Sequence, residues 1–131
     1  QGFEPDGYSE LYDDVYSCGT LYKITVGGTL PNNFSMYGRG NKTEVTRVRL
    51  MLNVNQQAYA ARDTKELGRL CEKMVTNLIG SAPEGFANKV AAGRAFELTH
   101  GGYRLILERK NWPTGKGYEL NCVVATPNHK E

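Results

Sequence analysis

The sequence predicts an α+β domain in which one long helix packs on one face of a largely antiparallel sheet of about five strands. Three observations carry this prediction. Two segments of alternating hydrophobicity lie at 20–26 and 45–55, one long amphipathic segment lies at 60–80, and three more alternating segments fill 95–126. The expected order is helix, two strands, two helices and three strands. The length of the chain suits a single domain, 1–131.

The N-terminal arm, residues 1–17, predicts a short helix with a strong negative charge. It contains 5 acidic residues and no Lys or Arg, so the rest of the chain has a balance of +7 beneath the net charge of +2. Ser9 can cap a helix over 9–18, in which tyrosines recur at four-residue steps. We expect the arm to dock on the basic body of its own chain.

The first two strands are predicted from strict alternation. Tyr22, Ile24 and Val26 share one face of the segment 20–26. In the segment 45–55, apolar residues alternate with mostly polar ones, namely Val48, Leu50, Leu52 and Val54 against Arg47, Arg49, Met51 and Asn53. We expect the two strands to pair as a hairpin.

The segment 60–80 predicts the principal helix of the chain. Apolar residues recur there at three- and four-residue steps, at Leu67, Leu70, Cys71, Met74 and Leu78. Asp63 or Thr64 is the expected N-cap, and Gly80 is the expected end. This helix is long and regular enough to cover one face of the sheet.

A weaker helix and a three-stranded meander complete the chain. The weaker helix is expected around 84–92, where Gly85 and Gly93 lower the helix propensity. The strands are expected at 95–99, 103–110 and 118–126, with glycine-containing turns between them, and the tail 127–131 is expected to fray.

The long segment 27–43 lies between the first two expected strands and has no repeating apolar pattern. Loops beyond ~12 to 15 residues without structure of their own are uncommon, and they tend to be functional or disordered. This one carries aromatic and cationic residues typical of interfaces, so we expect it to anchor a protein partner. The predicted anchor residues are Phe34, Met36, Tyr37, Arg39 and Lys42. A wandering connection or a third strand is the alternative.

The face of the sheet turned away from the helix is expected to be basic. The predicted partner-binding residues on it are Lys23, Arg47, Arg49 and Arg104. Its other outward positions are partly aliphatic, which favours a protein partner over nucleic acid, because nucleic acid requires aromatic stacking platforms. The alternative is a solvated face with ion pairs between neighbouring strands.

The three cysteines, Cys18, Cys71 and Cys122, form no metal-binding motif, and we expect no metal and no cofactor. Cys71 and Cys122 both fall on apolar faces, so a disulfide between them is one expectation. A Cys18–Cys122 bridge and three free thiols are the alternatives. Because the sequence begins at Gln1, we expect a leader to have been removed from a secreted or periplasmic protein. No segment approaches the ~18 apolar residues of a membrane span.

No catalytic motif is complete in the sequence. The segment GRGNKT has Asn41 between its last glycine and its lysine and lacks the context of a phosphate-binding loop. Of the two histidines, His100 lies in a glycine turn and His129 in the tail. We therefore predict no catalytic residue. The alternative is a small hydrolase that uses His100 with a nearby carboxylate or with a cysteine, Cys18 or Cys122.

The segment VYSCGTLYKITV is similar to the Tyr-x-Cys strand that opens the small periplasmic C-type lysozyme inhibitors, and Cys122 is similar to the late disulfide partner of that group. Those inhibitors are nearly all β, whereas 58–80 predicts a strong helix. We therefore assign no site residue from this resemblance.

The predicted function is a small exported non-catalytic binding module, an inhibitor or immunity-type protein, that engages a protein partner through 27–43 and the basic sheet face. A structural subunit of the cell envelope that adds an edge strand to an assembly is a further alternative.

Overall fold

The computed structural model describes residues 9–12, 15–24, 32–40 and 45–127, and it describes the first two strands by their backbone alone. The strands are β1 (Ser9–Tyr12), β2 (Val15–Ile24), β3 (Asn33–Gly40), β4 (Val45–Val54), β5 (Phe96–His100), β6 (Tyr103–Asn111) and β7 (Tyr118–Ala125). A 3-10 turn, η1 (Gln57–Tyr59), leads into helix α1 (Ala60–Ile79), and a short helix α2 (Phe86–Ala91) follows.

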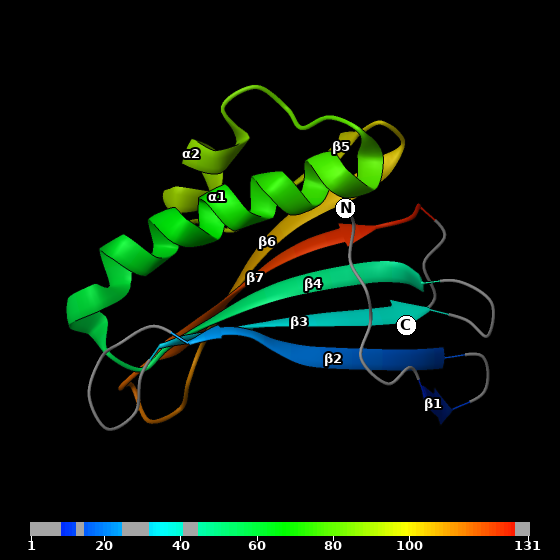
Figure 1. Ribbon diagram of the computed structural model, residues 1–131. Helices are drawn as coiled ribbons and strands as arrows, with labels where there is room; N and C mark the ends of the chain where they lie inside the picture. Colours follow the sequence, from blue (N-terminus) through cyan, green and yellow to red (C-terminus); the bar gives the residue numbers. More distant parts are fainter. Residues whose placement is uncertain (1–8, 13–14, 25–31, 41–44, 128–131) are drawn as a thin grey trace.

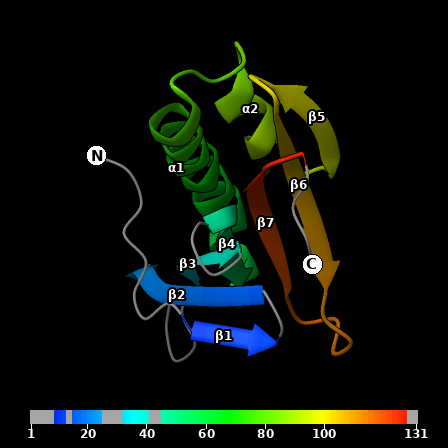
Figure 2. The ribbon, with the colours of Figure 1, turned by 90° about the vertical axis from the view of Figure 1, so that its right-hand side faces the viewer.

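All seven strands belong to one antiparallel sheet in the order β1-β2-β3-β4-β7-β6-β5. The four N-terminal strands form one meander, and the three C-terminal strands form another that runs back towards the first. The two meanders meet where β4 pairs with β7. Figure 2 shows the strong twist of the sheet, in which β1 and β2 run across the direction of β5 and β6.

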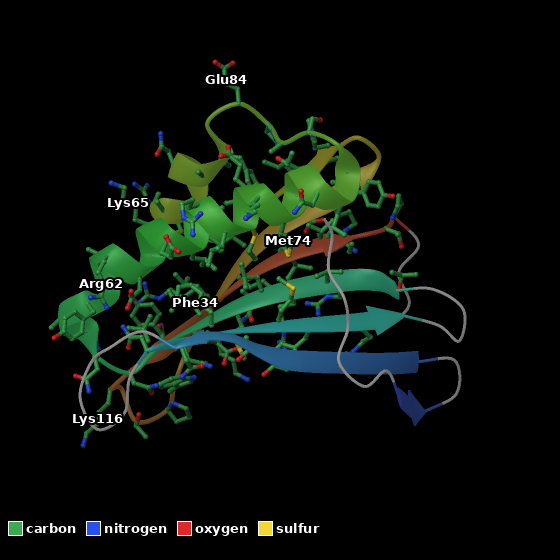
Figure 3. All side chains as sticks on the ribbon, in the orientation of Figure 1. Phe34, Arg62, Lys65, Met74, Glu84 and Lys116 are labelled. Carbon is green, nitrogen blue, oxygen red and sulfur yellow. A yellow bond between two sulfur atoms is a disulfide. The ribbon has the colours of Figure 1, made fainter. Side chains whose placement is uncertain are left out.

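Helix α1 lies along one face of the sheet, with α2 beside it (Figure 1). Its buried stripe includes Leu67, Leu70, Cys71 and Met74, the apolar positions that repeat at helical spacing. Gly80 ends the helix in a left-handed conformation with φ of 105°, which glycine adopts without a steric penalty. Figure 3 shows Phe34 and Met74 between α1 and the sheet, whereas Lys65 and Glu84 point away from it.

A buried polar network joins the start of β3 to the start of α1. The side chain of Asn32 donates from Nδ2 to Asp63 Oδ2 at 2.8 Å, and its Oδ1 accepts the backbone N–H groups of Asn55 and Gln56 at 2.7 Å each. Arg62 donates to the other carboxylate oxygen of Asp63. Asp63 and Thr64 therefore lie inside the first turns of α1 rather than capping it, and the expected cap is wrong, because η1 starts the helical turns earlier.

The predicted fold class is confirmed: an α+β domain with an antiparallel sheet and a long helix on one of its faces. The C-terminal strands lie within about two residues of their predicted bounds, and α1 and α2 lie where helices are expected. For α1 and the last three strands the reason is that their apolar periods are uninterrupted.

The N-terminal part differs from the prediction, and the sheet has seven strands rather than about five. The segment expected to form a helix over 9–18 instead forms β1 and the start of β2. Tyr12 lies in β1 and Tyr16 in β2, and aromatic and β-branched residues favour strands, so the four-residue spacing of the tyrosines does not by itself indicate a helix. The predicted arm 1–17 otherwise lies largely outside the described residues, as does most of the tail 127–131.

The segment 27–43 is not a loop throughout, because β3 occupies its second half. β3 pairs with β2 on one side and with β4 on the other, so the expected hairpin between the two flanking strands is wrong. Gly38 and Gly40 carry no hydrophobic signal, and they interrupt the alternation that would have revealed this strand.

Candidate binding site

The residues of the predicted anchor do not form a common surface. Phe34 and Met36 point to the helix side of β3 and are only 0% and 9% exposed, within the hydrophobic core. They therefore cannot serve as exposed partner contacts, and this part of the prediction is wrong. The physical reason is strand alternation, which turns every second residue of β3 towards α1. Lys42 lies outside the described residues.

Three of the four cationic residues predicted to face away from α1 do so, namely Arg47, Arg49 and Arg104. In the strand register, Tyr37 lies opposite Arg49, and Arg39 lies opposite Arg47, which in turn lies in the same row as Arg104. Lys23 lies in β2, where its backbone pairs with Phe34, and its side chain is outside the described part of the chain. We call the side of the sheet away from α1 the outer face.

Two of the cations on the outer face are paired with carboxylates. Arg47 Nη2 lies 3.8 Å from Glu108 Oε1, and Arg104 Nε lies 3.0 Å from Glu97 Oε2. These contacts fit the alternative of ion pairs between neighbouring strands, and because the carboxylate of each pair is exposed, each contributes at most about 1 kcal/mol. Arg49 is the central cation of the outer face, because it lies in β4 between Tyr37 of β3 and Val123 of β7.

The outer face is not open to solvent along β7. Asn121, Val123 and Ala125 point to this side of β7 and are 4%, 0% and 2% exposed. The face expected to be basic is therefore closed to a partner along β7. The face is open further along the sheet, where the β6 residues Glu108 and Lys110 are exposed.

A depression of about 540 Å³ lies between these two regions. It extends from β4 across β7 and β6 to the residue before β5. Its lining residues are Arg49, Ala95, Glu108, Arg109, Lys110, Glu119 and Asn121. Three of them are basic and two are acidic, so the depression is polar and combines both signs of charge.

Arg49 is held in the depression by an aromatic contact rather than by a carboxylate. Its guanidinium lies 4.6 Å from the centroid of the Tyr37 ring. Its Nε is buried and has no acceptor within the part of the chain that the structure describes. Tyr37 and Arg49 face each other across the β3–β4 ladder, so the strand register sets this contact.

Asn121 supplies the complementary unpartnered atom. Its Nδ2 donates to Glu119 Oε2 at 2.9 Å, and because an ionised carboxylate only accepts, the amide must present its nitrogen to Glu119. The Oδ1 of Asn121 therefore points elsewhere, and it is buried without a donor among the described residues. Two residues that line the depression thus each carry a buried atom without a partner among the described residues, a donor in Arg49 and an acceptor in Asn121.

A second layer holds Glu119 in position. Trp112 Nε1 donates to Glu119 Oε1 at 3.5 Å, so each carboxylate oxygen accepts one side-chain donor. On the opposite face of β7, Cys122 forms a disulfide with Cys71 of α1, with a Cα–Cα distance of 6.3 Å. This disulfide is one of the predicted pairings, and it ties the strand that carries Asn121 to the helix.

His100 has a serine rather than a cysteine as its neighbour. Ser81 Oγ lies 3.0 Å from His100 Nε2 at the C-terminal end of α1. Cys71 and Cys122 are bonded to each other, and β2, which contains Cys18, is separated from β5 by four strands, on the order of 20 Å. The cysteine form of the hydrolase alternative is therefore wrong. Among the described residues, no carboxylate forms a hydrogen bond or ion pair with His100.

The sequence interpretation missed Asn121 and Ser81. Asn121 had a signal in the sequence, because it interrupts an otherwise apolar run at the end of β7. Ser81 had none, because its approach to His100 depends on how α1 packs against β5.

Groups of histidine, cysteine and acidic side chains suited to a metal ion are absent from the described residues. Across the same part of the chain, no helix is both long and apolar enough to cross a membrane. The disulfide is compatible with an extracellular location. No protein-family model matches the chain, and no curated protein or solved structure is significantly similar to it.

Proposed function

We propose that the protein is an exported, non-catalytic binding module of the inhibitor or immunity type, which engages a protein partner through the outer-face depression. The observation that carries this proposal is that two residues lining that depression, Arg49 and Asn121, each have a buried side-chain atom, Nε and Oδ1, with no partner among the described residues. The depression takes the place of the anchor expected at 27–43.

The chemistry of the two atoms favours a peptide group. A buried donor or acceptor left without a partner costs about 1 to 3 kcal/mol, so a group that satisfies both atoms would gain affinity. A main-chain amide presents a carbonyl oxygen that can accept from Arg49 and an N–H that can donate to Asn121. A protein partner offers such groups wherever its backbone is exposed.

The disulfide supports the exported location. Disulfides persist mainly in oxidising compartments, so the Cys71–Cys122 bond favours a secreted or periplasmic protein. An inhibitor or immunity protein in such a compartment requires a stable scaffold with a preformed site. The covalent link between β7 and α1 provides that rigidity directly behind Asn121.

A displayed library of random peptides tests the proposal, because selection from it does not require the partner to be identified. Peptides selected on the wild-type protein should bind Arg49→Met at least about tenfold more weakly, a loss equivalent to about 1.4 kcal/mol. The matched control is Arg104→Met, which removes an outer-face cation that is paired with Glu97 outside the depression. Equal affinity of the selected peptides for both variants would overturn the proposal.

A second candidate function, a small serine hydrolase, is favoured by the contact between Ser81 and His100. A histidine at hydrogen-bond distance can activate a serine as a nucleophile. A fluorophosphonate probe should then label the wild-type protein and fail to label Ser81→Ala and His100→Ala. Absence of labelling in the wild-type protein would end this candidate.

A further inference from the structure

β6 has an open edge beside the depression. β5 begins at Phe96, which pairs with Leu107, so the β6 residues that follow Leu107 pair with β7 alone. Figure 2 shows β6 continuing beyond the beginning of β5. The four β6 residues of this edge, 108–111, are all exposed, and so is Ala95, which precedes β5. We call this stretch the open edge.

The open edge is polar, and on its outer side its backbone groups have no strand partner among the described residues. An antiparallel strand offers hydrogen-bond donors and acceptors alternately to its two sides, and here β7 occupies only one side. An extended segment could therefore add to β6 in the place that β5 leaves free. Ala95, Glu108, Arg109 and Lys110 line both this place and the depression, so the two are continuous.

The charge that is free to act at the open edge is positive. Arg109 and Lys110 are exposed and form no ion pair with the described residues; Arg109 contacts the Tyr118 ring at 3.8 Å and donates to Asn111. The two acidic residues nearby are already engaged, Glu108 with Arg47 and Glu119 with Asn121 and Trp112. A further exposed cation, Arg94, lies next to Ala95 in the chain.

We infer that the partner supplies an extended acidic segment that adds to β6 along 108–111 as an additional strand. Arg109 and Lys110 project from opposite faces of β6, so an added strand meets a cation on each of its faces. Opposite charges on neighbouring strands are favourable, and the segment should therefore carry acidic residues at two successive positions. At the positions opposite Glu108 and Asn111, the added segment should carry uncharged residues. This inference rests on the proposed function.

The probe is a capped synthetic hexapeptide, Thr-Val-Glu-Glu-Val-Thr, compared with versions in which Gln-Gln or Lys-Lys replaces the central pair. The acidic peptide should bind about tenfold more tightly than the Gln-Gln version, and the Lys-Lys version should not bind. The double variant Arg109→Gln/Lys110→Gln should abolish this preference. Lys65→Gln/Lys73→Gln is the matched control, because these exposed lysines lie on α1.

Hydrogen exchange separates strand addition from charge attraction. Binding of the acidic peptide should slow exchange of alternate backbone amides within 108–111. In the peptide, methylation of the backbone nitrogens at every second residue should abolish binding when the methylated nitrogens face β6, and it should not when they face away. Binding without protection of these amides would overturn the inference. If, in that case, the library-selected peptides still bind the wild-type protein more tightly than Arg49→Met, only strand addition is overturned and the proposed function is retained.

The occupant is also tested by self-association. Residues 1–17 of the chain are acidic, and a second copy could offer them to the open edge. Protection of 108–111 that appears on raising the protein concentration without any peptide would assign the edge to a second copy. That result would overturn the inference of a separate partner.

Discussion

The two faces of β7 are both buried, but they are buried with different chemistry. Towards α1 the strand presents Leu120, Cys122 and Val124, which pack in the core. Towards the outer face it presents Asn121 beside Val123, and Asn121 shares its depression with the buried Nε of Arg49. The residues on the α1 face are explained by core packing and by the disulfide, which lowers the chain entropy of the unfolded state. The outer face retains polar atoms that stability does not require, which is typical of sites kept for function.

The largest difference between the faces should appear in β3. Phe34→Ala removes a fully buried ring from the core and should lower the free energy of unfolding by about 4 kcal/mol. Tyr37→Ala, three residues along on the outer face, should cost less than about 1.5 kcal/mol, because it loses a half-buried ring and one cation–π contact. Urea unfolding of both variants measures this. Equal losses would mean that the two faces are not distinct.

The disulfide should give the next largest effect. Replacing both cysteines, Cys71→Ser/Cys122→Ser, should lower the free energy of unfolding by about 3 kcal/mol, because a long loop in the unfolded chain is no longer closed. Wild-type protein unfolded in reductant should lose a similar amount, and the double variant should not respond to reductant. A wild-type midpoint unaffected by reductant would contradict the bond.

A satisfied polar network should behave unlike the unsatisfied pair on the outer face. Asn32→Ala removes the donor to Asp63 Oδ2 and the acceptor of two backbone N–H groups, and it should cost about 2 kcal/mol. Asn53→Ala is a suitable control, because Asn53 is only half-buried and donates one side-chain bond, to Asn33. If the control were the more destabilising of the two in urea unfolding, the network would not have the role described.

How far the sequence predicts the molecule depends on the regularity of its patterns. α1 and the last three strands follow from unbroken apolar periods. β3 does not, because two glycines interrupt its alternation, and the tyrosines of the arm fit a helix as well as a strand. Alternation also predicts that Arg47, Arg49 and Arg104 share a face. It cannot predict which of them lacks a carboxylate partner among the described residues, because that depends on the register of four strands.

The smallest effect on stability belongs to Arg49, and it tests the central claim most directly. Arg49→Met should unfold within about 0.5 kcal/mol of the wild-type protein or at higher urea, because it removes a buried donor that has no acceptor among the described residues. A library-selected peptide should raise the unfolding midpoint of the wild-type protein and leave that of Arg49→Met unchanged. An Arg49→Met variant that is strongly destabilised, or that the peptide stabilises as much as the wild-type protein, would contradict the account.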